Sequence, residues 1–167
     1  MAGQVVAGSS VDLIDSAVIP DAVPDYIRDH AQRYLASNGA DGHLSIGGQA
    51  HPKLQNIPSL LLVTQGRKSG RHYLMPLYYG SDGARFVVIG SKGGNPEHPG
   101  WYKNILAHPD VRLQVGDRRM DALAATASGP ERERLWAMME TVFHGYKTYK
   151  QRAAPREIPV VVLTPKG

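Results

Sequence analysis

The sequence predicts an α+β protein in which mostly antiparallel strands form a barrel or a strongly curved sheet with helices at its edges. Three observations support this class. Short apolar runs alternate with turn signals, most neighbouring runs are close enough to form hairpins, and helical periodicity is confined to segments outside them. The chain has 167 residues, of which 42% are apolar and 20% charged, as is ordinary for one globular domain. We expect a partly flexible, loosely docked N-terminal extension over residues 1–23 and one barrel domain over residues 24–167.

The first predicted helix begins after Pro24, because proline suits the first turn of a helix and an acidic residue follows it. Apolar and aromatic residues recur at helical spacing over residues 26–35, and Asn38-Gly39 is a typical stop signal. The next segment, residues 39–57, is rich in glycine and is predicted to be a long loop. A loop of this length inside a compact domain is more often functional or partner-contacting than inert.

Five or six strands are predicted from short apolar runs bounded by turn residues, at residues 60–64, 73–79, 85–90, 111–115, 120–126 and 158–163. The first run is continuously apolar, which is typical of a buried strand. Pro76 lacks an N–H group, so the second strand belongs at a sheet edge or contains a bulge. Further helices are predicted over residues 99–108, 131–143 and 146–152, and Ser128 supplies a start signal for the second of them.

Two cationic bends flanked by glycine follow the first and third predicted strands. Residues 66–70 read Gly-Arg-Lys-Ser-Gly, and residues 91–94 read Ser-Lys-Gly-Gly shortly before a helix that begins with proline. Glycine lets the backbone turn its N–H groups outward and the neighbouring cations add positive charge, which together suit a phosphate or a carboxylate. Because one hairpin separates the bends, they could hold a single long cofactor that carries several negative charges.

Each of these features also has a plainer explanation. For residues 66–70 alone, a solvent-exposed hairpin turn is the simpler interpretation, because such turns are often polar and cationic. That interpretation is weaker for residues 91–94, since each of two adjacent glycines costs backbone entropy of about 1 kcal/mol. Composition alone favours core positions for Trp101 and Tyr102, whereas Asn104 has no obvious structural task.

The net charge of +4 and the pI near 9.4 favour anionic partners, without choosing among an acidic cofactor, nucleic acid and an anionic membrane surface. A nucleic-acid partner is not expected, because only 7% of the residues are aromatic and no basic stacking platform is evident. The lack of cysteine excludes disulfides and cysteine nucleophiles, and the scattered histidines predict no metal site. No secretion signal or membrane-spanning run is evident, so we expect a cytoplasmic protein, with peripheral membrane association left open.

Eight short motifs follow one another over residues 60–165, which is about two-thirds of the chain. The motifs are Gly66-Arg67-Lys68-Ser69-Gly70, Pro76-Leu77-Tyr78, Ser91-Lys92-Gly93-Gly94, Pro99-x-Trp101-Tyr102-x-Asn104, His108-Pro109, Glu131-Arg132-Glu133-Arg134-Leu135-Trp136, Tyr146-x-x-Tyr149 and Ile158-Pro159-Val160-Val161. Each piece is weak, but the ordered set is specific. It resembles the deazaflavin-dependent nitroreductase family, whose members use coenzyme F-420, an 8-hydroxy-5-deazaflavin with a phosphate and an oligoglutamate tail.

The resemblance implies a split β-barrel of the FMN-binding-like type, with residues 24–167 as the cofactor-binding domain. It assigns the cofactor phosphate and tail to the two bends, that is to Arg67, Lys68, Ser69, Ser91, Lys92, Gly93 and Gly94. It assigns the walls of the cofactor groove to Met75, Pro76, Trp101, Tyr102 and Asn104. The family commonly has an arginine where this chain has Tyr73. Arg71 could supply that charge from the same side of the strand; if it does not, cofactor affinity should be weaker than is typical of the family.

The resemblance also implies an enzyme that transfers a hydride from the reduced deazaflavin to an electron-poor small molecule, such as a quinone, an activated alkene or a nitro compound. By family position, Tyr146 and Tyr149 are candidate proton donors, and Ser91 lies beside the cofactor ring. A helix face packed on the barrel explains the two tyrosines almost equally well. Two other functions stay open. One is a non-enzymatic lipid- or cofactor-binding protein of the same fold, whose pocket the helix after Pro24 and the loop 39–57 could cover, and the other is an FMN-dependent oxidoreductase. The chain could act as a monomer or a homodimer.

Overall fold

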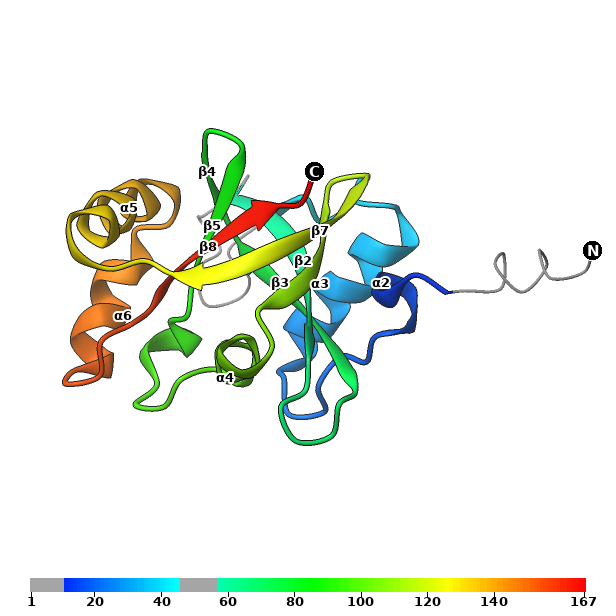
Figure 1. The fold of residues 1–167 in the computed structure, drawn as a ribbon, viewed down its shortest axis with the longest axis horizontal. Coiled ribbons are helices and arrows are strands. Elements are labelled where there is room, and N and C mark those ends of the chain that lie inside the picture. Colours follow the sequence, from blue (N-terminus) through cyan, green and yellow to red (C-terminus); the bar gives the residue numbers. More distant parts are fainter. Residues whose placement is uncertain (1–10, 46–56) are drawn as a thin grey trace, which may run out of the picture.

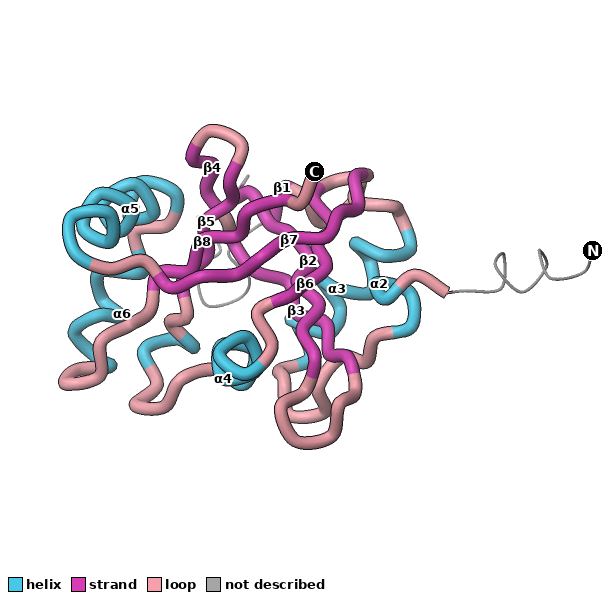
Figure 2. The backbone as a smooth tube through the Cα atoms, in the orientation of Figure 1, coloured by secondary structure: helices cyan, strands magenta, loops and turns pink. Residues whose placement is uncertain are grey.

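The computed structural model describes residues 11–45 and 57–167, which form a curled sheet with helices around it (Figures 1 and 2). Within these residues the strand order is β1-β2-β6-β7-β8-β5-β4, β3 also pairs with β2, and every pairing of these strands is antiparallel. The strands are β1 (Leu44–Ser45), β2 (Ile57–Gln65), β3 (His72–Tyr78), β4 (Gly80–Asp82), β5 (Arg85–Ile89), β6 (Asp110–Val115), β7 (Arg118–Thr126) and β8 (Val160–Pro165). The helices are α2 (Leu13–Ser16), α3 (Asp25–Ala36), the short 3₁₀ turn η1 (Lys92–Gly94), α4 (Gly100–Ala107), α5 (Gly129–Val142) and α6 (Gly145–Ala153).

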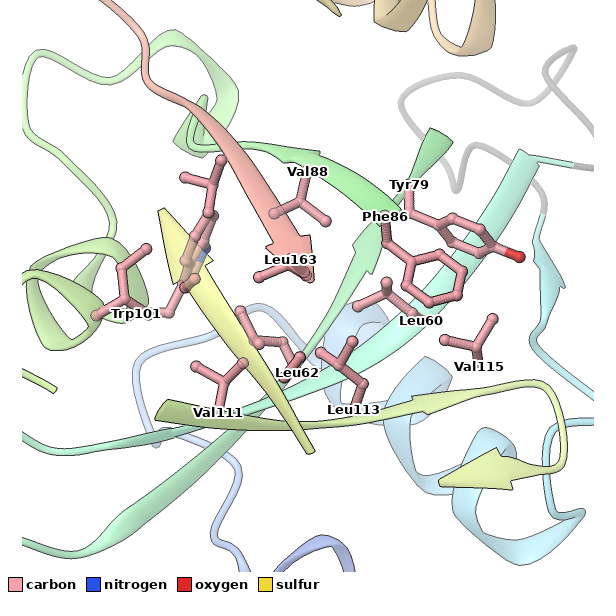
Figure 3. Close-up of a cluster of buried hydrophobic side chains, with 14 of the residues drawn as sticks. Leu60, Leu62, Tyr79, Phe86, Val88, Trp101, Val111, Leu113, Val115 and Leu163 are labelled. Carbon is pink, nitrogen blue, oxygen red and sulfur yellow. The ribbon is translucent and has the colours of Figure 1, made fainter. Parts of the chain in front are cut away.

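The inner face of the curled sheet encloses the main hydrophobic core (Figure 3). Leu60 and Leu62 of β2 lie opposite Val115 and Leu113 of β6, so their side chains meet on the same face of the sheet. Trp101 of α4 enters this core and is only 6% exposed. Helix α4 is therefore anchored to the barrel by burial of an aromatic side chain.

The strand β2 is buried on both faces. Leu61 and Val63 point away from the main core and pack with Ile14 of α2 and Tyr34 of α3. Successive side chains of a strand point to opposite faces, so a strand covered on both sides favours apolar residues at consecutive positions. This explains the continuous apolar run and confirms the predicted buried strand.

The helices α5 and α6 cover the outer face of β5 and β8 (Figure 1). Val87 of β5 and Val162 of β8 belong to the same buried cluster as Trp136 and Met139 of α5 and Tyr146 of α6. The α+β class, the antiparallel sheet and the flanking helices predicted from the sequence are thus confirmed.

The segment from residue 11 onward is held firmly against the sheet. Ile14 is fully buried, and the Asp12 carboxylate accepts hydrogen bonds from the Arg112 guanidinium of β6 at 2.7 and 3.1 Å. Arg119 of β7 donates to Asp15 at 2.8 and 2.9 Å. The expectation of loose docking is therefore wrong for residues 11–20, because these ion pairs join residues about a hundred positions apart. Residues 1–10 lie outside the described residues.

All the predicted helices and strands are present, with small shifts at their ends, but two short strands, the short helix α2 and the 3₁₀ turn η1 were missed. β1 and β4 contain two and three residues, which is too few to show an alternating pattern. β1 lies inside the predicted loop 39–57, of which residues 46–56 are outside the described residues.

Pro76 lies in β3, which pairs only with β2 among the named strands, so its predicted edge position is confirmed. Ser128 is the residue before α5, but its side chain makes no capping hydrogen bond.

Replacing Asp12 with asparagine should lower the free energy of unfolding by about 2 kcal/mol at neutral pH. Hydrogen bonding from Arg112 lowers the pKa of Asp12 from 3.8 to about 2. A lowered carboxyl pKa gives stability that is present above the unfolded value and is lost as the pH falls through the folded value. Urea unfolding between pH 7 and pH 3 should therefore show the two proteins converging as the pH falls.

Asp121→Asn is the matched control, since Asp121 also contacts Arg112 but its side chain is 63% exposed. Its loss should stay below about 1 kcal/mol. Equal losses for the two variants would contradict this assignment.

Candidate active site

The two cationic bends open onto one cavity of about 1300 Å³. Its wall includes Arg67 and Lys68 from the first bend and Ser91 and Lys92 from the second. In Figure 1 both bends lie on the same side of the sheet, with α4 between them. The shared groove expected from the sequence is therefore present.

The first bend is tied to α4 by Asn104. The Asn104 side-chain oxygen accepts hydrogen bonds from the Arg67 backbone N–H at 3.2 Å and from the Arg67 guanidinium at 2.8 Å. Its amide nitrogen donates to the Thr64 hydroxyl at 3.1 Å. Asn104 is 5% exposed and lines the cavity. Its structural task, which the sequence did not reveal, is to join the first bend to β2 and α4 through these hydrogen bonds.

The backbone of this bend is fixed mainly by its own hydrogen bonds. The Gly66 N–H donates to the Arg71 carbonyl at 2.6 Å, and the Gly70 N–H donates to the Gly66 carbonyl at 3.0 Å. Among the described residues, the backbone N–H groups of Lys68 and Ser69 have no hydrogen-bond partner. These two N–H groups, with the neighbouring side chains, are the donors that the bend offers to an anion.

The second bend has a left-handed backbone. Lys92, Gly93 and Gly94 have φ angles of 47°, 62° and 82°, a region that glycine adopts without strain. A side chain at Gly94 would come within 2.9 Å of the Arg152 Cβ and 3.0 Å of the Tyr149 carbonyl oxygen, both on α6. The two glycines thus allow the turn to reverse and to pack closely on α6, which is a structural reason for them besides anion binding.

Most of the predicted site residues share the cavity. They are Arg67, Lys68, Ser69, Met75, Pro76, Ser91, Lys92, Gly93, Trp101, Asn104, Tyr146 and Tyr149. Met75 and Pro76 come from β3 and form a largely apolar part of the wall. The cavity thus combines cationic bends with apolar and aromatic walls.

Three predicted residues do not line the cavity. Tyr102 is buried in the main core, and its hydroxyl hydrogen bonds with the Thr126 hydroxyl at 2.9 Å, so composition predicted its place correctly. Gly94 is buried against α6. The Arg71 guanidinium lies 6.0 Å from the centre of the Tyr73 ring. Tyr73 lines the cavity and lies 3.3 Å from the Ser69 hydroxyl, so Arg71 does not take the place of the family arginine in the wall.

The two tyrosines of α6 differ in their surroundings. Tyr146 is 4% exposed and packs with Trp136 and Phe143, so it serves the core as well as the cavity wall. Burial raises the pKa of Tyr146, and burial followed by the nearby Tyr26 raises the pKa of Tyr149. Both hydroxyls therefore remain protonated at neutral pH, and Tyr149 is the less buried of the two.

The helix after Pro24, α3, was expected to cover a pocket only in the alternative carrier function, and none of its residues was assigned to the cavity wall. Tyr26, Ile27 and His30 of this helix line the same cavity as Tyr149. The His30 ring nitrogen Nε2 lies 2.8 Å from the Gly42 carbonyl oxygen, and burial lowers the pKa of His30. Helical periodicity identified α3 itself, but it carries no information about which distant element the helix faces.

A family model described as "F420H(2)-dependent quinone reductase" matches residues 26–165. The chain belongs to this family. Membership confirms the expected coenzyme F-420 and the expected reductase activity, and it favours this function over a non-enzymatic carrier or an FMN enzyme. The family description names quinones rather than nitro compounds.

Known relatives agree with this membership. A quinone reductase of the same description from Mycobacterium tuberculosis is 38% identical over 141 residues, which is 83% of this chain and 89% of the relative. The solved structure of a reductase described as F420-H2 dependent (FDR-A) is 36% identical with a TM-score of 0.59, over 64% of this chain and 93% of that chain. A second solved structure, a domain-swapped dimer, is 32% identical with a TM-score of 0.62, over 83% and 97%. The split-barrel fold expected from the resemblance is thereby confirmed.

Asn104→Ala should weaken binding of coenzyme F-420 about tenfold, because the Arg67 bend loses the acceptor that holds it. Titration of the protein with the oxidised cofactor, followed by tryptophan fluorescence, measures the dissociation constant. Leu106→Ala is the control on the same helix, since Leu106 is 63% exposed. If Asn104→Ala binds as tightly as the unchanged protein while Arg67→Ala binds more weakly, Asn104 does not position the bend.

Proposed function

We propose that the cavity holds reduced coenzyme F-420 with its phosphate and acidic tail at the two bends and its ring against Met75, Pro76 and Trp101, and that a quinone accepts the hydride. One observation carries this proposal: both cationic bends open onto the same cavity, whose remaining wall is mostly apolar and aromatic, with its two carboxylates, Asp29 and Asp41, paired to Arg33. An anionic tail joined to an aromatic ring matches this division of the wall.

The residues present fit such a cofactor. Arg67, Lys68 and Lys92 bring three positive charges to the cavity, and the Lys68 and Ser69 backbone N–H groups add neutral donors. The volume of about 1300 Å³ exceeds that of an ordinary small-molecule site, which is at most about 1000 Å³. The cavity is therefore large enough to suit a ligand longer than an ordinary small molecule.

When bound, the reduced deazaflavin supplies the hydride, and the protein supplies binding, orientation and a proton. Met75, Pro76 and Trp101 form an apolar wall that excludes water from one side of the ring. Tyr149 holds a proton at neutral pH, because its raised pKa keeps the hydroxyl protonated. This hydroxyl can donate a hydrogen bond to a quinone oxygen as negative charge develops there.

The relative solved as a domain-swapped dimer supports a homodimer for this chain. Among the residues that the structure describes, no helix has the length and apolar character needed to cross a bilayer. Cytoplasmic location and peripheral contact with a membrane stay predictions.

Lys68→Ala and Lys92→Ala should each weaken binding of coenzyme F-420, and the loss should be larger at low salt, because the charges are exposed and screened by ions. Each loss should be about three- to tenfold. Fluorescence titration at two salt concentrations provides the measurement. Lys147→Ala removes an equal charge from the exposed side of α6 and should leave the dissociation constant unchanged. Unchanged binding in both cavity variants would remove the assignment of the bends to the cofactor.

Tyr149→Phe should lower kcat with a soluble quinone such as menadione about tenfold or more while sparing cofactor affinity. The assay follows oxidation of reduced coenzyme F-420 by absorbance. Tyr102→Phe is the matched control, since its hydroxyl hydrogen bonds with Thr126 and Tyr102 does not line the cavity. Full activity of Tyr149→Phe with every quinone tried would exclude it as the proton donor.

A further inference from the structure

Arg156 directs its whole guanidinium group at the second cationic bend and the residues that follow it. Its Nη2 donates to the Ser91 carbonyl at 2.8 Å and to the Asn95 carbonyl at 2.7 Å, and its Nε donates to the Asn95 carbonyl at 2.9 Å. Its Nη1 donates to the Gly90 carbonyl at 3.1 Å and to the His98 ring nitrogen Nδ1 at 3.0 Å. No carboxylate of the described residues pairs with Arg156, so its positive charge is balanced only by these dipoles.

These contacts fix the direction of the peptide groups in the bend. In a trans peptide the C=O and N–H groups point in opposite directions. The carbonyls of Gly90 and Ser91 point at Arg156, so the N–H groups of Ser91 and Lys92 point away from it, and both residues line the cavity. Arg152 also holds a carbonyl of this bend, since it donates a hydrogen bond to the Gly93 carbonyl at 3.0 Å. The carbonyl oxygens, which would repel an anion, are thus held back by two arginines.

The contact with His98 sets a protonation state. An arginine can only donate hydrogen bonds, so Nδ1 of His98 must accept and the ring must be neutral. Protonation at Nδ1 would place one N–H group against another, and a cation against a cation. The groups that face His98 are Arg156, Lys103 of α4 and the Tyr102 ring, whose centre lies 4.9 Å from the His98 ring. Burial, followed by the charges of Arg156 and Lys103, lowers the pKa of His98.

We propose that Arg156 is a positioning residue for the cofactor-binding bend and that it holds the bend only while His98 is neutral. The inference rests on the proposed role of the bend in binding coenzyme F-420. Acid should therefore weaken cofactor binding through His98. A simple charge effect would do the opposite, because a protonated His98 would add positive charge near an anionic ligand.

The test compares wild type with His98→Asn, because the asparagine side-chain oxygen can accept at the position of Nδ1 and does not titrate near neutral pH. Dissociation constants for coenzyme F-420 are measured by fluorescence titration near pH 7.5 and near pH 5. Any titration of the ligand changes the dissociation constants of both proteins equally, so the comparison at each pH removes it. Both proteins should bind alike near pH 7.5, and wild type should bind at least about fivefold more weakly than the variant near pH 5. Parallel affinities at both pH values would overturn the inference.

A second readout needs no cofactor. The backbone amide NMR signals of Ser91 and Lys92 should titrate with His98 in the unliganded wild type and should stay constant in His98→Asn, because Arg156 holds the carbonyls of the peptide groups to which these amides belong. If wild type fails to bind coenzyme F-420 even near pH 7.5, the proposed function fails, and the amide signals still decide whether Arg156 and His98 control the bend. Constant signals in wild type would overturn that control.

Arg156→Lys separates charge from geometry. Lysine keeps the positive charge but cannot make the same set of contacts, so binding near pH 7.5 should weaken about tenfold. Arg134→Lys on α5 is the matched control, because Arg134 pairs with Asp82 at the surface. Wild-type affinity in Arg156→Lys, with an unchanged unfolding midpoint in both variants, would mean that only the charge matters.

Discussion

The fixed position of α4 against the sheet and beside the cavity is the constraint on which the site depends. Burial of Trp101 and Ile105 in the main core fixes this helix relative to the sheet. From that fixed position Asn104 holds the first cationic bend. The residues just before the helix connect it to the second bend, where His98 meets Arg156. One helix thus contacts or connects to both cationic bends, which follow different strands.

In both bends, hydrogen bonds within the protein fix the direction of the backbone peptide groups. A bend that binds an anion must expose N–H groups and cations while its carbonyl oxygens are turned away. In the first bend the backbone bonds to itself and to Asn104, which leaves the Lys68 and Ser69 N–H groups available. In the second bend, Arg152 donates a hydrogen bond to the Gly93 carbonyl and Arg156 donates one to the Ser91 carbonyl. These arginines raise the local positive potential and order the loop through the same contacts.

The sequence predicted the elements and the two bends well because their signals are local. Apolar runs, turn residues and the glycine-flanked cations all lie within a few positions of one another. It could not predict contacts between distant segments, such as Arg156 with Ser91 or Asp12 with Arg112, because no local pattern records them. For the same reason the residues of α3 that line the cavity and the structural role of Asn104 appeared only in the structure. Tyr73 lines the cavity and Arg71, two positions earlier, does not, a difference that depends on how this part of the chain is placed in the fold.

The central claim, that the two bends grip one anionic cofactor, is tested most directly with two ligands: complete coenzyme F-420 and a deazaflavin that lacks the phosphate and the acidic tail. Affinities of the Lys68 and Lys92 alanine variants are measured for both. The account predicts that each variant loses affinity for the complete cofactor and binds the truncated one as well as wild type does. Equal losses for the two ligands, or a loss in only one of the variants, would contradict it.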